Sequence, residues 1–112
     1  METDSEIHII NEHNFKAAVI GEQKPLLLLC MPHDDQFAEQ VNIVMKMATK
    51  YSGLLKVGLV EESFIRLFKK KYQIPGTPTF LLLEQGSEKN RSLGLADEQM
   101  LTLLVGESCA PT

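Results

Sequence analysis

A run of six apolar residues, at positions 26–31, restricts the architecture more than any other segment of the chain. It reads Leu-Leu-Leu-Leu-Cys-Met and stands between Pro25 and Pro32, which leaves it too short for a helix. A short apolar run with such flanks is typical of a strand that is covered on both faces of a sheet. It is also far below the roughly 20 residues that cross a bilayer, so no membrane span is expected.

Strand and helix patterns alternate on either side of this run. Strands are expected at residues 6–10, 26–31, 54–60, 78–84 and 89–93, with a turn at 85–87 that makes the last two an antiparallel hairpin. Helices are expected from the capping residue Asn11 to about Gly21, from the segment 32–35 to about Tyr51, from Ser63 to a basic last turn, and from Asp97 to about Gly106. The order βαβαβαββα predicts an α/β protein, a three-layer α/β/α sandwich around a mixed sheet.

Length and charge limit the organisation and the partners. One domain is expected over residues 1–112, with an ordered core at about 6–107, because a chain of this size can bury one hydrophobic core. The formal charge is −4, and such an acidic surface is repelled by phosphate backbones and anionic lipids. Nucleic acid and membranes are therefore not expected partners. The first six residues are acidic, unlike the basic start of a secretory signal, which predicts a cytoplasmic location.

The chain contains two cysteines, Cys30 and Cys109. Their separation matches neither a disulfide framework nor paired zinc ligands, so both are expected to be reduced thiols. Cys30 lies in the apolar run and is expected to be a buried, unreactive thiol with a raised pKa. Cys109 is expected to be exposed in a mobile tail and to react at an ordinary rate.

The segment 74–80, which reads Ile-Pro-Gly-Thr-Pro-Thr-Phe, resembles the loop and cis-proline of the thioredoxin family. Residues 51–53 and 71–74 are similar to the ends of two helices in that family. Gly86 and Gly94 match its hairpin glycine and the glycine before its last helix. Each motif is weak alone, but together, at the family's spacing, they extend the resemblance over nearly the whole chain.

This resemblance implies a detailed arrangement of strands. The strands at 54–60 and 26–31 are expected to be parallel neighbours, and the strand at 78–84 is expected to lie antiparallel on the other side of 26–31. The bond between Thr77 and Pro78 is expected to be cis, a conformation that few X–Pro bonds adopt in folded proteins.

The chain departs from the family at the residues that carry thiol chemistry. The same register places the family's Cys-Gly-Pro-Cys motif on residues 34–37, which read Asp-Asp-Gln-Phe, and its tryptophan on His33. The family's buried acid falls on Leu28. Thiol exchange needs a thiolate and a second, resolving thiol, and Asp34 and Asp35 supply neither. The resemblance therefore implies the fold without the oxidoreductase activity, and no cofactor is expected.

His33, Asp34 and Asp35 have ordinary structural roles as well as possible functional ones. An aspartate at a helix start is most often a cap or a first-turn acid, and its functional alternative is an anionic recognition point. Neighbouring residues on a helix diverge, and no other Cys or His stands at ligand spacing, so a metal site is not expected.

The first functional hypothesis is a redox-inactive, protein-binding or chaperone-like module. In the thioredoxin family the backbone before the cis-proline pairs with an extended substrate segment, which implies a partner of that kind here. The implied groove is lined by His33, Asp34, Asp35, Thr77 and Pro78. Its acidic rim favours a basic protein or peptide segment. The oligomeric state is left open.

Two alternatives belong to other functional classes. One is a thioredoxin-family thiol oxidoreductase of altered chemistry, which uses Cys30 or Cys109 as a lone thiol. The other is a small-molecule or metal-binding protein at the end that carries His33, Asp34 and Asp35. The missing pair of thiols places both behind the binding module, so enzyme activity is not expected.

Overall fold

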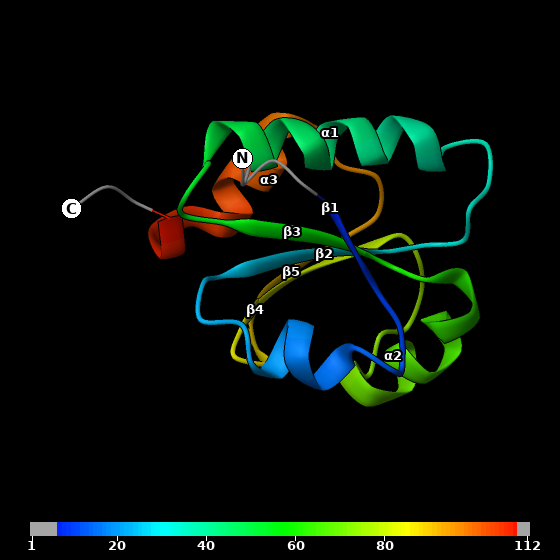
Figure 1. Ribbon diagram of the computed structural model, residues 1–112. Coiled ribbons are helices and arrows are strands. Elements are labelled where there is room, and N and C mark those ends of the chain that lie inside the picture. Colours follow the sequence, from blue (N-terminus) through cyan, green and yellow to red (C-terminus); the bar gives the residue numbers. More distant parts are fainter. Residues whose placement is uncertain (1–6, 110–112) are drawn as a thin grey trace.

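A mixed sheet of five strands forms the centre of the computed structural model, which describes residues 7–109 (Figure 1). The strands are β1 (Ile7–Ile10), β2 (Leu26–Cys30), β3 (Lys56–Val60), β4 (Thr79–Glu84) and β5 (Ser87–Leu93). In space they follow the order β1-β3-β2-β4-β5. β3 is parallel to β1 and β2, whereas β4 is antiparallel to β2 and β5. The predicted neighbours of the central strand are thus confirmed.

The apolar run at 26–31 forms the central strand because both of its faces are covered. All five residues of β2 are buried, and Leu28 pairs with Gly58 of β3 on one side and Leu81 of β4 on the other. Leu27 and Leu29 belong to one hydrophobic core, and the alternate residues of β2 belong to a second core on the opposite face. A strand with two buried faces requires apolar residues at every position, as this run supplies.

Helices cover both faces of the sheet and give three layers. The helical segments are the π-helical η1 (Lys16–Ile20), α1 (Phe37–Lys50), the 3₁₀ turn η2 (Glu62–Phe64), α2 (Ile65–Tyr72), α3 (Glu98–Val105) and the 3₁₀ turn η3 (Gly106–Cys109). α1 and α3 lie on one face, while η1 and α2 lie on the other (Figure 1). Val44 and Met47 of α1 pack in the first core, and Phe68 of α2 packs in the second. The predicted α/β architecture is therefore confirmed.

Of two predicted capping residues, Asp97 caps its helix, whereas Asn11 closes a turn that precedes the first helical segment. The side chain of Asp97 accepts a hydrogen bond from the backbone N–H of Met100 at 2.8 Å and caps α3. The side-chain oxygen of Asn11 accepts hydrogen bonds from the N–H groups of His13 and Asn14, at 2.9 and 3.0 Å. The Asp97 bond satisfies an N–H group that the first turn of a helix leaves unpaired. The expected cap at Asn11 is wrong, because η1 begins only at Lys16 and has no side-chain cap.

The predicted boundaries around β3 need correction. The strand begins at Lys56 and not at Leu54, because the N–H groups of Leu54 and Leu55 both donate to the carbonyl of Tyr51 in the preceding turn. Ser63 is not a cap, since its hydroxyl donates to the carboxylate of Glu61 at 2.7 Å. In both places a local turn takes up hydrogen-bonding groups that the expected strand or helix start would have used.

The end of the described chain differs from the predicted mobile tail. η3 continues the fold to Cys109, beyond the expected limit of the core at 107, and the Ser108 hydroxyl donates to Glu84 at 2.8 Å. Cys109 is only 2% exposed and packs in the first core. The expectation of an exposed Cys109 is therefore wrong. Residue 6 of the predicted first strand and residues 110–112 of the predicted tail lie outside the described residues.

None of the helices within residues 7–109 has the length and apolar character that crossing a membrane would require.

Candidate functional site

The predicted site residues meet at one end of the sheet. His33, Asp34 and Asp35 follow β2, and Thr77 and Pro78 precede β4. β2 and β4 are antiparallel, and Cys30 at the end of β2 pairs with Thr79 at the start of β4. Segments that leave β2 and enter β4 must therefore lie at the same edge. The Thr77–Pro78 peptide bond is cis.

Asp34 closes a turn before α1 and does not cap the helix itself. Its side chain accepts a hydrogen bond from the Gln36 N–H at 3.0 Å, and its backbone carbonyl accepts one from the Phe37 N–H at 3.1 Å. The helix begins only at Phe37, with no side-chain cap. The expected helix cap is thus replaced by a local turn of the kind that aspartate favours. Asp34 and Asp35 both remain exposed, so they present two carboxylates to solvent.

His33 is held by Glu62, a residue outside the predicted set. The His33 N–H donates to a Glu62 carboxylate oxygen at 2.9 Å, and the imidazole Nδ1 lies 3.9 Å from the other carboxylate oxygen. The imidazole ring also stacks on Phe37, with the ring centres 3.9 Å apart. One pattern could have revealed Glu62: β2 and β3 are parallel neighbours, so the residues that follow them meet at one edge.

An apolar hollow of about 320 Å³ lies beside the cis-proline. It is lined by Pro75, Gly76, Thr77, Pro78, Leu93 and Gly94. Leu93 was not predicted as a site residue, although it stands next to Gly94 in the sequence. His33, Asp34 and Asp35 do not line this hollow, so the acidic residues and the Thr77 loop form two separate parts of the same end of the molecule.

The backbone of Thr77 offers hydrogen-bonding groups that the fold does not use. Its N–H and C=O form no hydrogen bond with another residue of the described chain. The loop is held on either side, because the Thr79 hydroxyl donates to the Gly76 carbonyl at 2.7 Å and the Gly94 N–H donates to the Pro78 carbonyl at 2.8 Å. A fixed loop with an unpaired donor and acceptor can pair with an added extended chain, as a strand edge does.

Both cysteines are buried, and they lie in different cores. Cys30 is fully buried, and burial raises the pKa of its thiol to about 11, although the positive charge of Lys69 acts in the opposite direction. Burial also raises the pKa of Cys109, and the negative charge of Glu84 adds to this effect. Cys30 belongs to the core on one face of the sheet and Cys109 to the core on the other. The two thiols therefore cannot act as a pair.

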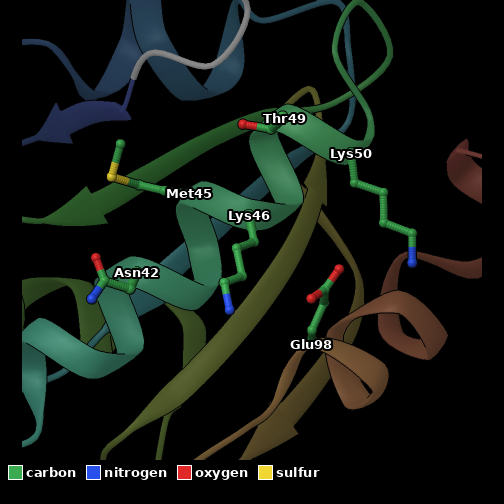
Figure 2. A pocket seen from close by; sticks show the side chains of 6 residues that line it. All are labelled: Asn42, Met45, Lys46, Thr49, Lys50 and Glu98. Carbon is green, nitrogen blue, oxygen red and sulfur yellow. The ribbon is translucent and has the colours of Figure 1, made fainter.

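A hollow of about 650 Å³ between α1 and α3 lies outside the predicted site (Figure 2). Its lining residues are Asn42, Met45, Lys46, Thr49, Lys50 and Glu98. Lys50 donates a hydrogen bond to the Thr102 hydroxyl at 2.9 Å, so one of the two lysines is already engaged. The lining contains no cysteine or histidine and a single carboxylate, that of Glu98. Within residues 7–109, no three Cys, His, Asp or Glu side chains are placed to share a metal ion.

Comparison with known proteins relates this geometry to a fold. No family model matches the sequence, and no curated protein matches it either. Among solved structures, a mutant thioredoxin from Halobacterium salinarum NRC-1 superposes with a TM-score of 0.83, over 100% of this chain and 98% of that one. The chain has a thioredoxin-like fold. Since only 16% of the residues are identical, the similarity shows the fold alone.

The thioredoxin-like fold gives a common frame for the site residues. In this thioredoxin-like chain, Asp-Asp-Gln-Phe occupies residues 34–37 between β2 and the body of α1, and no cysteine is present there. The two cysteines that the chain does contain are buried elsewhere. This end of the molecule presents the carboxylates of Asp34 and Asp35 to solvent, and the Thr77 loop lies at the same end.

Proposed function

We propose that this thioredoxin-like protein binds an extended segment of another protein through the Thr77–Pro78 loop and performs no thiol–disulfide exchange. The observation that supports this most strongly is the unpaired N–H and C=O of Thr77 beside an apolar hollow. An extended chain can satisfy both groups, and one of its side chains can enter the hollow. This mode of binding gives affinity through the backbone and needs no cysteine.

The placement of the thiols argues against the alternative, an oxidoreductase with a lone cysteine. Exchange requires a thiolate that reaches a substrate disulfide. Cys30 and Cys109 are both buried and both have a raised pKa, so little thiolate forms at neutral pH and a disulfide cannot approach it. The carboxylates of Asp34 and Asp35 cannot attack a disulfide sulfur productively. Binding is therefore favoured over catalysis.

The exposed carboxylates indicate the charge of the partner. Asp34 and Asp35 lie at the same end of the sheet as the Thr77 loop and are both exposed. A segment that carries Lys or Arg beside its paired stretch gains attraction, and salt weakens it. A surface this small supports transient binding, with a dissociation constant on the order of micromolar.

Selection from a display library of random peptides tests the proposal and does not require that the partner be identified first. Peptides selected on the wild type should bind about tenfold more weakly to Thr77→Arg, because the long side chain covers the free backbone groups. Thr49→Arg provides the matched control, since Thr49 is exposed on α1 and away from the loop. Selected peptides that bind Thr77→Arg as tightly as the wild type would exclude this face.

The charge of the partner can be tested with the same peptides. Asp34→Asn with Asp35→Asn removes two charges, and an asparagine at position 34 keeps an oxygen that can accept from Gln36. Basic peptides should then bind a few-fold more weakly and show less dependence on salt. Unchanged affinity and unchanged salt dependence would show that the two carboxylates do not contact the segment.

A further inference from the structure

A third hollow, between Pro32 and the start of α2, has a different chemistry. It has a volume of about 350 Å³ and is lined by Pro32, Glu62, Ile65, Arg66 and Lys69. Pro32 and Ile65 form its apolar part, while Arg66 and Lys69 supply two cations from α2. We call this surface the α2 groove. It shares no lining residue with the hollow beside Thr77.

The cations of the α2 groove have no partner in the described chain. Neither the Arg66 nor the Lys69 side chain forms a hydrogen bond or ion pair with another residue among 7–109. Lys70 is exposed one helical turn after Arg66, on the same side of the helix. Glu62 brings one negative charge to the same lining, against the two positive charges of Arg66 and Lys69, so one positive charge remains in excess. The surface therefore combines an apolar floor with uncompensated positive charge.

The helix dipole explains only part of this cluster. Lysines at 69 and 70 lie in the last turn of α2, where the negative end of the dipole favours cations. Arg66, however, lies before the last turn, where the negative end of the dipole no longer favours a cation. Arg66 therefore stands beside an apolar hollow without a partner among residues 7–109 and without support from the dipole, which points to an anionic ligand.

We propose that the α2 groove docks an acidic segment of a partner polypeptide. One aliphatic side chain of the segment fills the hollow between Pro32 and Ile65, and carboxylates on either side pair with Arg66 and Lys69. The proposal stands apart from binding at Thr77, since the two surfaces use different residues and attract opposite charges. It concerns a second contact, whether to the same partner or to another.

The observations favour a polypeptide over the other polyanions. A nucleic acid or an anionic membrane would approach a protein whose formal charge is −4. Of the four cations on α2, Lys71 lies over the Phe15 ring, 5.0 Å from its centre, which leaves three beside the groove, fewer than a typical polybasic membrane cluster contains. A phosphate group also makes no favourable contact with the apolar part of the groove, which Pro32 and Ile65 form. An aliphatic side chain that is flanked by aspartate or glutamate satisfies both halves of the groove.

A short fluorescein-labelled peptide with a central leucine between glutamates is the probe for the test. We expect its fluorescence anisotropy to rise on addition of the full chain at low salt. The same peptide with serine in place of leucine should bind about fivefold more weakly, and one with lysines in place of the glutamates should show no binding. Equal binding of the leucine and serine peptides would overturn the proposal, because the hollow would then hold no side chain.

Charge reversal locates the peptide on the protein. Arg66→Glu with Lys69→Glu should weaken the acidic peptide by about tenfold or more. The matched control, Lys16→Glu with Lys46→Glu, makes the same change of net charge at two exposed positions and should change the affinity by less than about threefold. Equal loss in both double variants would overturn the proposal, since it would reflect only the overall charge. Far-ultraviolet circular dichroism checks that each variant is folded, and Arg66→Gln with Lys69→Gln replaces the first pair if it is not.

Further measurements distinguish binding in the α2 groove from binding at the Thr77 loop and from binding to a lipid surface. Thr77→Arg should leave the affinity of the acidic peptide unchanged, so failure of the Thr77 proposal and failure of this one give different results. In titrations observed by amide chemical shifts, the largest changes should fall on α2 and not on the Thr77 loop. Binding of phosphatidylserine vesicles with the same sensitivity to Arg66→Glu and Lys69→Glu would instead identify a lipid surface and contradict a polypeptide partner.

Discussion

Cys30 and Cys109 differ in their place in the sequence but share one environment, the interior. The apolar neighbours of Cys30 predict its burial, which the structure confirms. The small and polar residues around Cys109 predict exposure, and this is wrong. Gly106, at a φ of +40°, ends α3 and leads the chain into η3, where Ser108 is bonded to Glu84. A contact with a residue so distant in the sequence has no local pattern.

Burial should make both thiols slow to alkylate. At neutral pH, a pKa of about 11 in place of 9.0 reduces the thiolate fraction of Cys30 by about 100-fold, and its lack of exposure slows it further. Cys109 should also react slowly until the protein unfolds. Mass spectrometry after iodoacetamide treatment, with and without denaturing guanidinium, measures both rates. Rapid labelling of Cys30 in the native protein would revive the lone-thiol alternative.

The same thiol predicts how stability changes at alkaline pH. In the folded protein the Cys30 thiol has a pKa of about 11, whereas in the unfolded chain its pKa is 9.0. Between these pH values the native state therefore binds more protons than the unfolded state. The contribution of Cys30 to the free energy of unfolding should therefore be fully present below pH 9. It should be lost as the pH rises from 9 to 11, which lowers the stability by about 2 to 3 kcal/mol. Urea unfolding at a series of pH values measures this.

The variant Cys30→Ala shows how much of the loss of stability at alkaline pH is due to Cys30. The pKa of Tyr72 is also raised by burial, so part of the loss belongs to that phenol and should persist in the variant. The stability of the wild type relative to the variant should fall by about 2 to 3 kcal/mol as the pH rises through this range, whatever the difference between them is at neutral pH. Parallel pH profiles for the two proteins would show that Cys30 titrates as it does in the unfolded chain.

At the scale of elements, a buried polar side chain connects α1 to the loop before α3. Gln40 is 2% exposed, and its side-chain amide donates to the Ala96 carbonyl at 3.1 Å and accepts from the Ala96 N–H at 2.9 Å. Gln40→Leu keeps the volume but leaves both backbone groups unpaired, so we expect a loss of about 2 to 4 kcal/mol in urea unfolding. Gln99→Leu is the exposed control and should change stability by less than about 0.5 kcal/mol. Equal effects would mean that the two bonds contribute nothing.

The order of the elements could be predicted from the sequence, whereas their exact ends could not. The apolar run at 26–31 has one reasonable place in a sheet, and it takes that place. Ser63 and Asp34 both stand where a cap is expected, but each makes a hydrogen bond two residues away, with Glu61 and Gln36 respectively. Single-residue propensity cannot distinguish a cap from such a turn, because the same side chain suits both.

For the candidate site too, the end of the sheet at which the residues lie could be predicted from the sequence, whereas their individual contacts could not. Thr77 and the acidic residues could be assigned to one end because the order of the strands requires it. The parallel pairing of β2 and β3 also places Glu62 at this end, but its hydrogen bond with His33, and the position of Leu93 beside Pro78, depend on how separate segments meet in three dimensions. The α2 groove arises in the same way, since Pro32 and Ile65 belong to different segments.

At the scale of the whole molecule, a thioredoxin-like fold without paired thiols should not catalyse disulfide reduction. We expect the rate of insulin reduction by dithiothreitol to be the same with and without the protein, because neither buried cysteine can form a mixed disulfide. Asp34→Cys with Phe37→Cys serves as the positive control, since it introduces two thiols at the turn before α1. Acceleration by the wild type that Cys30→Ala abolishes would establish the lone-thiol enzyme instead.

The location of a bound segment decides whether the Thr77 loop is the binding site. The measurement is a titration of the isotopically labelled protein with a peptide selected on the wild type, observed through backbone amide chemical shifts. We expect the largest shifts to fall on Thr77 and its neighbours in the loop, with smaller shifts at Asp34 and Asp35. The substitution Thr77→Arg should abolish all of these shifts. Shifts confined to α2, or to the hollow between α1 and α3, with no change at Thr77, would contradict the proposal.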